Sequence, residues 1–89
     1  MWYPKIVASA EKILAQARNN PKGLRFSELQ RLAKALGYEL SRVNGSHHIY
    51  THPTRPELPQ LNMQEDKGMA KAYQVRQVLS VIDEFELEV

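Results

Sequence analysis

One short segment, residues 44–50, constrains the fold of this chain more than any other part of its sequence. Its first step, Asn44-Gly45, is a strong signal for a two-residue hairpin turn. The β-branched and aromatic residues that follow favour a strand. The sequence therefore predicts an antiparallel hairpin with strands at residues 38–43 and 46–52. Two of the chain's three histidines, His47 and His48, begin the second strand.

Side chains in a strand alternate between the two faces of its sheet. Residues 47, 49 and 51 share one face, and residues 46, 48, 50 and 52 share the other. In a sheet covered on one side, we expect Ile49 to face the core and His48 to face solvent or a ligand. Imidazole titrates near neutral pH, so an exposed His48 beside Tyr50 and the Ser46 hydroxyl is a candidate for proton transfer. A solvated or structural histidine is the alternative.

Size and composition describe one small folded domain. The chain has 89 residues, and 43% of them are hydrophobic, which suits a globule with one modest core. The absence of cysteine excludes disulfides and thiolate chemistry and fits a reducing compartment. No apolar run approaches the ~20 residues that span a bilayer, and residues 1–4 lack the form of a signal peptide. We therefore expect a cytoplasmic protein.

The net charge of +2 conceals an uneven distribution. Residues 1–82 hold all 12 Lys and Arg against six acids, which gives +6, whereas residues 83–89 hold four acids and no base, which gives −4. A basic body suits a polyanion such as nucleic acid. Ordinary solubilising charge is the alternative.

Two helices are predicted before the hairpin. Residues 4–18 have helical apolar spacing with Pro4 in the first position. Residues 28–36 follow Ser27, which forms the S-x-x-Q pattern of a capping box. Gly37 then suits the helix end.

A third strand is predicted after the hairpin, at residues 57–63, with Pro59 placing it at a sheet edge. Residues 65–68 are expected to form a loop, and residues 70–85 a last helix with a buried apolar stripe. The order is α-α-β-β-β-α. Burial of each apolar stripe then predicts an α+β fold in which helices cover one face of a three-stranded antiparallel sheet.

Several basic residues are candidates for contacts with phosphate. Lys67 and Lys71 lie just before and at the start of the last helix, where backbone N–H groups favour an anion. Arg76 lies further along that helix, and Arg42 lies on the first strand of the hairpin. Solvated side chains are the alternative. The aromatic rings of Trp2, Tyr38 and Tyr50 could stack on bases, although packing at the edge of the core is the more ordinary role for Trp2 and Tyr38.

The three histidines do not form a pattern typical of a metal site. His48 and His52 are four residues apart on one strand face, about 13 Å, too far to share an ion bound at about 2 Å. His47 and His48 point to opposite faces. We expect no metal and no cofactor.

These residues bring the chain close to a known family. The segments 26–29 (Phe-Ser-Glu-Leu), 35–38 (Ala-Leu-Gly-Tyr) and 42–53, which contains Gly-Ser-His-His-Ile-Tyr, resemble the HicA family of toxins. The resemblance covers residues 26 to about 82 and leaves the helix at residues 4–18 outside. It implies a double-stranded-RNA-binding-domain-like α-β-β-β-α fold. It also implies a metal-independent ribonuclease that cleaves mRNA with one strand histidine and that a HicB-type antitoxin neutralises.

The family's histidine corresponds to His48, in the Gly-Ser-x-His position, with His47 as the alternative. We expect one HicA-like domain, with an extra helix and turn at residues 1–23, a core at 24–85 and an acidic tail at 86–89. The expected function is an endoribonuclease of a type II toxin–antitoxin system. A non-catalytic RNA-binding module and a pure interaction protein are the rival functions. The expected RNA contacts are Ser46, Tyr50, Arg42, Lys67, Lys71 and Arg76.

Overall fold

The computed structural model describes residues 9–89. The predicted helix start at Pro4 and the aromatic candidate Trp2 lie outside these residues. The elements, in chain order, are α1 (Ala10–Asn19), the 3₁₀ turn η1 (Pro21–Gly23), α2 (Phe26–Ala35), β1 (Glu39–Asn44), β2 (His47–Thr51), β3 (Leu61–Asp66), β4 (Met69–Ala70) and α3 (Ala72–Glu84).

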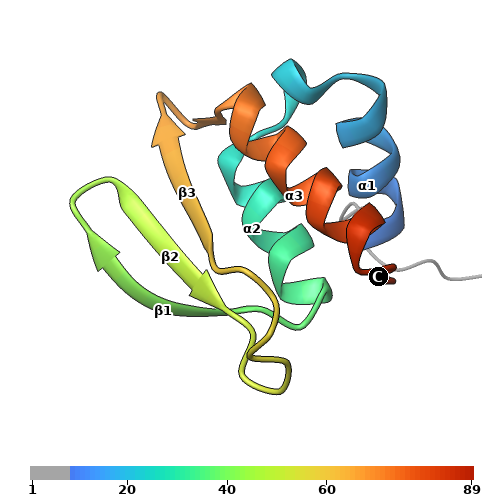
Figure 1. The fold of residues 1–89 in the computed structure, drawn as a ribbon. Coiled ribbons are helices and arrows are strands. Elements are labelled where there is room, and N and C mark those ends of the chain that lie inside the picture. Colours follow the sequence, from blue (N-terminus) through green and yellow to red (C-terminus); the bar gives the residue numbers. More distant parts are fainter. Residues whose placement is uncertain (1–8) are drawn as a thin grey trace, which may run out of the picture.

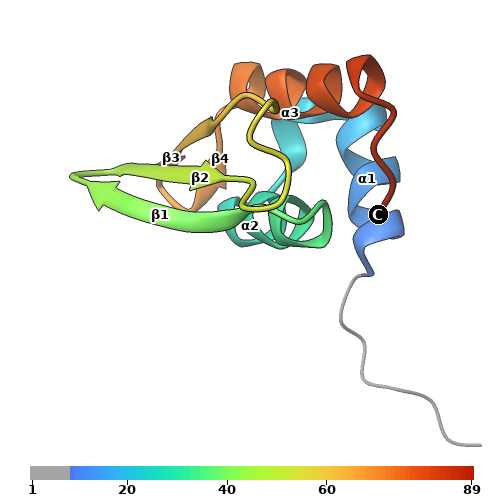
Figure 2. The same ribbon diagram turned by 60° about the horizontal axis from the view of Figure 1, so that its bottom comes forward.

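The molecule consists of one antiparallel sheet and a layer of helices. The strand order is β1-β2-β3-β4. Helices α2 and α3 lie beside the sheet, and α1 lies on their far side, away from the strands (Figure 1). The β1–β2 hairpin extends beyond the helices, with its tip farthest from α1 (Figure 2). The predicted α+β class is therefore confirmed.

The sheet has one more strand than the sequence predicts. Residues 65–66, expected in a loop, continue β3, and the chain then turns at Lys67-Gly68 into the two-residue strand β4. Lys67 has φ 55° and Gly68 has φ 83°, the pair of positive angles that a type I′ hairpin turn requires. As a result β3 lies between β2 and β4, and Pro59 precedes the strand instead of marking a sheet edge.

The first hairpin turns one residue later than expected. Asn44 is paired with His47, so the two central residues are Gly45 and Ser46. Gly45 has φ 64°, and a positive φ at the first central residue alone is the signature of a type II′ turn. His47 and His48 still begin the second strand.

The prediction that Ile49 faces the core and His48 the open face is wrong. Tyr50 is 1% exposed and belongs to the main hydrophobic cluster. Across the ladder it pairs with Leu61, and His48 pairs with Met63, both of which also belong to that cluster. His48 therefore lies on the helix-covered face. Ile49 is buried on the opposite face, outside the main cluster.

This reversal has a simple cause. The strand carries an apolar residue on each face, Ile49 on one and Tyr50 on the other, so alternation alone does not decide which face is covered. The larger ring of Tyr50 fills the space above α2, and its hydroxyl accepts a hydrogen bond of 3.1 Å from Nε2 of Gln30. Burying this aromatic side chain removes more apolar area from water than burying Ile49 against the helices would.

Helix α2 begins before its predicted start. Ser27, expected as the N-cap, is inside the helix, and the cap residue is Arg25, whose N–H donates to Oε1 of Glu28 at 2.9 Å. At the other end Gly37 has φ 100°, and two bonds close the helix, Gly37 N–H to Lys34 O and Tyr38 N–H to Ala33 O, both 3.0 Å. This pair of bonds is a Schellman motif, so the expected role of Gly37 is confirmed.

Helices α1 and α3 are joined at the surface and in the core. Ile13 and Ala17 of α1 are fully buried, while Arg18 makes a paired contact with Asp83 of α3 at 2.7 and 3.3 Å. Ser9 caps α1 by accepting a hydrogen bond of 3.2 Å from Lys12 N–H. In the part of the chain that the structure describes, no helix is long and apolar enough to cross a membrane.

Candidate nuclease site on the hairpin

His48 lies where the hairpin meets the start of α2. Its ring contacts the Phe26 ring edge-to-face, with centroids 4.9 Å apart. Its Nδ1 is 3.2 Å from the carbonyl oxygen of Ser46. Because a carbonyl only accepts, this contact assigns the proton of the neutral ring to Nδ1. Nε2 makes no hydrogen bond with residues 9–89, so a half-buried and oriented imidazole keeps one nitrogen free for a ligand.

His47 occupies the opposite, helix-free face. Its Nδ1 lies 3.0 Å from Oδ1 of Asn62 on the neighbouring strand. The two adjacent histidines therefore point away from each other, as strand alternation predicts, and they do not act on one reacting group.

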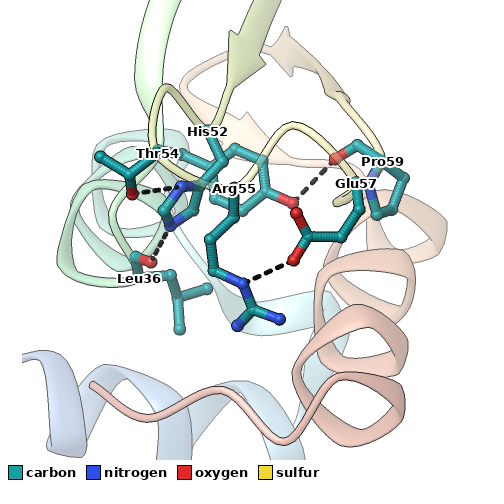
Figure 3. Close-up of polar contacts among 7 residues, drawn as sticks. Leu36, His52, Thr54, Arg55, Glu57 and Pro59 are labelled. Atoms are coloured by element: carbon teal, nitrogen blue, oxygen red, sulfur yellow. Dashed lines mark hydrogen bonds and ion pairs between the residues drawn. The ribbon is translucent and has the colours of Figure 1, made fainter.

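His52 is a structural residue that holds the end of β2 against the end of α2 (Figure 3). Its Nε2 is 3.0 Å from the carbonyl oxygen of Leu36, and its Nδ1 is 3.3 Å from the Thr54 hydroxyl. The ring also packs edge-to-face on Tyr38, with centroids 5.2 Å apart. With both nitrogens engaged, His52 is not available for proton transfer.

Tyr38 is a core residue and not a stacking platform. It is 1% exposed, and its hydroxyl donates to the carbonyl oxygen of Pro59 at 2.7 Å (Figure 3). Burial raises the pKa of this hydroxyl. The same loop is closed by an exposed contact of 2.8 Å between Nε of Arg55 and Oε2 of Glu57, which lowers the pKa of Glu57.

Ser46, at the tip of the hairpin, joins His48 to the other elements. Its carbonyl faces His48, and its Oγ accepts a hydrogen bond of 3.1 Å from Nε2 of Gln64 on β3. The N–H of Gln64 donates in turn to Oε1 of Gln74 on α3 at 2.6 Å. Sequence reasoning missed both glutamines. Of the two, only Gln74 could have been noticed in the sequence, because it is a polar residue next to the apolar stripe of the last helix.

Tyr50 is not positioned for the RNA contact that the sequence suggested. It lies on the same face as His48, but it is buried and its hydroxyl is occupied by Gln30. Its role is to fill the core beneath the hairpin.

The predicted basic residues are dispersed over the molecule. Lys67 forms the β3–β4 turn, which adjoins α2 because Phe26 N–H donates to Gly68 O at 3.0 Å. Lys71 is the residue before α3. Arg42 pairs with Ile49 and so lies on the face opposite His48. Arg76 lines a hollow on the α1 side of α3, together with Arg18 and Asp83.

Arg25 is a basic residue that sequence reasoning did not select. It immediately precedes Phe26, whose ring contacts His48, and it pairs with Met69 of β4. Arg25 lies just before a helix whose first residue contacts His48. This proximity follows from the fold and could not be predicted from the sequence alone. Arg25 and Lys67 are the two cations whose backbones adjoin the first residue of α2.

The geometry does not assemble a cation site in this part of the chain. Among residues 9–89, no three His, Asp or Glu side chains come together in a way that would hold a metal ion.

The fold defines a class, a small α-β-β-β-β-α domain preceded by an extra N-terminal helix. A family model described as the HicA toxin of bacterial toxin–antitoxin systems matches residues 26–83. Because the match covers well over half of the 89 residues, the chain belongs to the HicA toxin family. The match begins with the first residue of α2 and leaves α1 outside, as the resemblance implied. No curated protein and no solved structure matched the chain.

Proposed function

We propose that this HicA family member is an endoribonuclease that cleaves mRNA, with His48 as its catalytic residue and no metal requirement. The observation that carries the proposal is the state of His48. Its ring is held by Phe26 and Ser46, and its Nε2 has no partner among residues 9–89. An anchored ring with one free nitrogen has the arrangement that general acid–base catalysis needs.

The reaction follows from the chemistry of RNA. The ribose 2′-oxygen forms a bond to the adjacent phosphorus, and the bond from phosphorus to the 5′-oxygen breaks. Nε2 of neutral His48 accepts the proton of the 2′-hydroxyl, or the protonated ring donates one to the leaving 5′-oxygen. Water supplies or takes up the second proton. Proton transfer by a positioned side chain contributes about 10²–10⁴-fold to the rate.

Cations near the start of α2 are suited to hold the phosphate. Lys67 and Arg25 adjoin Phe26, and Lys71 precedes α3. The Ser46 hydroxyl accepts from Gln64 and keeps its own hydrogen for a phosphate oxygen. Arg42 and Arg76, on other faces, are assigned to flanking stretches of RNA. Charge on the phosphate that grows in the transition state is then offset by groups already in place.

A HicB-type antitoxin is the proposed protein partner, since the family is that of a toxin–antitoxin system. Neutralisation of the nuclease requires that the antitoxin keep RNA away from His48. Co-expression with a HicB-type antitoxin tests this, and loss of toxicity is the expected result.

The test of catalysis compares wild-type protein with His48→Gln and His47→Ala on unstructured RNA in excess EDTA. His48→Gln keeps the bulk that packs on Phe26 but cannot shuttle a proton, so we expect a loss of about 10²–10⁴-fold in cleavage with RNA binding retained. His47→Ala should cleave as the wild type does. Full activity in His48→Gln, or activity that disappears in EDTA and returns with a divalent ion, would contradict the proposal. Binding without cleavage by wild-type protein would favour the RNA-binding module.

A further inference from the structure

A chain of polar contacts connects His48 to helix α3. It runs from Nδ1 of His48 to the Ser46 carbonyl at 3.2 Å and from Ser46 Oγ to Nε2 of Gln64 at 3.1 Å. It continues from Gln64 N–H to Oε1 of Gln74 at 2.6 Å. Helix α3 thus contacts β3, and β3 contacts the two-residue turn whose carbonyl orients the His48 ring.

Gln74 supplies a hydrogen-bond acceptor that is missing because strand β4 is short. The β3–β4 ladder ends at the pair Glu65 and Ala70. The next partner of Gln64 would be Lys71, but Lys71 is the cap residue of α3 and has left the sheet. The side chain of Gln74, 4% exposed, accepts the Gln64 N–H in place of a strand carbonyl. A backbone donor that is partly shielded from water is costly when it is left unpaired, so this bond favours the observed position of Gln64.

Gln64, once fixed, constrains the hairpin tip. The turn at Gly45-Ser46 extends beyond the helices (Figure 2), and β1 beside it is exposed along its whole length. The Ser46 hydroxyl has its hydrogen-bond partner in Gln64. We propose that Gln64 and Gln74 are positioning residues, which hold the Ser46 carbonyl where it keeps the His48 proton on Nδ1 and Nε2 free. This proposal rests on the proposed role of His48 in cleavage.

A direct RNA contact by Gln64 would have a different kinetic signature. If Gln64 contacted RNA equally strongly in the bound substrate and in the transition state, losing that contact would raise KM and leave kcat unchanged. Loss of orientation lowers the fraction of His48 in the reactive tautomer, and so lowers kcat with KM nearly constant. The two roles therefore separate in steady-state kinetics.

The experiment uses full-length Gln64→Ala with Asn62→Ala as the matched control. Asn62 is an amide on the same strand and face, but it bonds His47 instead of Ser46. We expect kcat of Gln64→Ala to fall about three- to tenfold, the usual effect of one hydrogen bond, with KM within twofold of wild type. Asn62→Ala should keep both constants. Equal kcat in both variants, or a change in KM alone for Gln64→Ala, would overturn the proposal.

A conservative variant provides the rescue. In Gln64→Glu the carboxylate accepts from the Ser46 hydroxyl, so the link is restored with its direction reversed. We expect kcat to recover toward the wild-type value and KM to rise, because the Ser46 hydrogen is no longer free for the phosphate. A variant as slow as Gln64→Ala would contradict positioning through Ser46.

A readout without RNA separates this proposal from the proposed function. Nitrogen-15 spectra of His48 at alkaline pH, where the ring is neutral, should show the Nδ1–H tautomer in the wild type and in Asn62→Ala. In Gln64→Ala they should show a mixture that includes the Nε2–H tautomer. An unchanged tautomer in Gln64→Ala overturns the positioning role even if the wild type cleaves RNA. If the tautomer shifts in Gln64→Ala but the wild type cleaves no RNA, the proposed nuclease function is wrong and the positioning of His48 still holds.

Discussion

At the scale of single residues, the structure separates three histidines that look alike in the sequence. His52 has both ring nitrogens engaged, His47 bonds an amide on the helix-free face, and Nε2 of His48 has no hydrogen-bond partner among residues 9–89. Their roles therefore follow from what each ring contacts. The sequence selected His48 by residue type and by position in the motif, and its catalytic role stays a prediction, whereas the argument about its face is wrong.

Gly37 is the residue whose replacement should have the clearest effect on stability. Its φ is 100°, and a Cβ there would lie 2.4 Å from Nε2 of His52. Gly37→Ala should therefore combine backbone strain with displacement of His52, at about 2–4 kcal/mol. Gly45→Ala is the control, because Gly45 also has a positive φ, 64°, but has no atom within 4 Å of its Cβ position. It should lose only about 1 kcal/mol. Urea unfolding measures both, and equal losses would show that the contact with His52 is unimportant.

At the scale of elements, the errors of sequence reasoning have physical causes. Strand β4 has two residues and was missed because it shows no alternation of its own; it exists because Lys67-Gly68 adopts a type I′ turn. Helix α2 begins at Phe26 because the Glu28 side chain accepts a hydrogen bond from Arg25 N–H. This cap replaces the capping box that the sequence predicted at Ser27. By contrast, the Schellman end at Gly37 and the apolar stripes of α2 and α3 could be predicted, since they depend on local sequence alone.

The junction between β3 and α3 should depend on Gln74. Gln74→Met keeps the length and buried volume of the side chain but removes the acceptor for Gln64 N–H. A fully buried donor without a partner costs about 1–3 kcal/mol; because Gln64 is only partly buried, we expect the free energy of unfolding to fall by about 1 kcal/mol. Hydrogen exchange at the Gln64 amide should also accelerate relative to Asn62. A variant as stable as the wild type, with a protected Gln64 amide, would contradict this role.

The contact between α1 and α3 should depend on pH. Hydrogen bonding to Arg18 lowers the pKa of Asp83, so folding favours the ionised carboxylate. The contribution of the pair is present above the ordinary pKa of an aspartate and is lost as the pH falls through the lowered folded value. The stability difference between wild type and Asp83→Asn should therefore shrink as the pH falls below about 4. A difference that is constant from pH 7 to pH 2 would show that the ion pair contributes nothing.

At the scale of the whole molecule, the α+β class and the family could be predicted, whereas the arrangement around His48 could not. Residues 26–53 carry the motif, and the family match covers residues 26–83. The contacts among Ser46, Gln64 and Gln74 join a hairpin, a strand and a helix, and no local pattern encodes such a meeting. The same is true of Tyr50, whose burial depends on α2 supplying Gln30 above the sheet.

The central claim is that the ribose 2′-oxygen attacks the adjacent phosphorus while His48 transfers a proton at the 2′-oxygen or at the leaving 5′-oxygen. The most direct measurement compares cleavage of one RNA sequence, by wild-type protein in EDTA, in unmodified form and with every 2′-hydroxyl methylated. We predict cleavage of the unmodified RNA, with 2′,3′-cyclic phosphate and 5′-hydroxyl ends, and none of the methylated RNA, although both bind. Cleavage of the methylated RNA, or products that carry 5′-phosphates, would contradict the account.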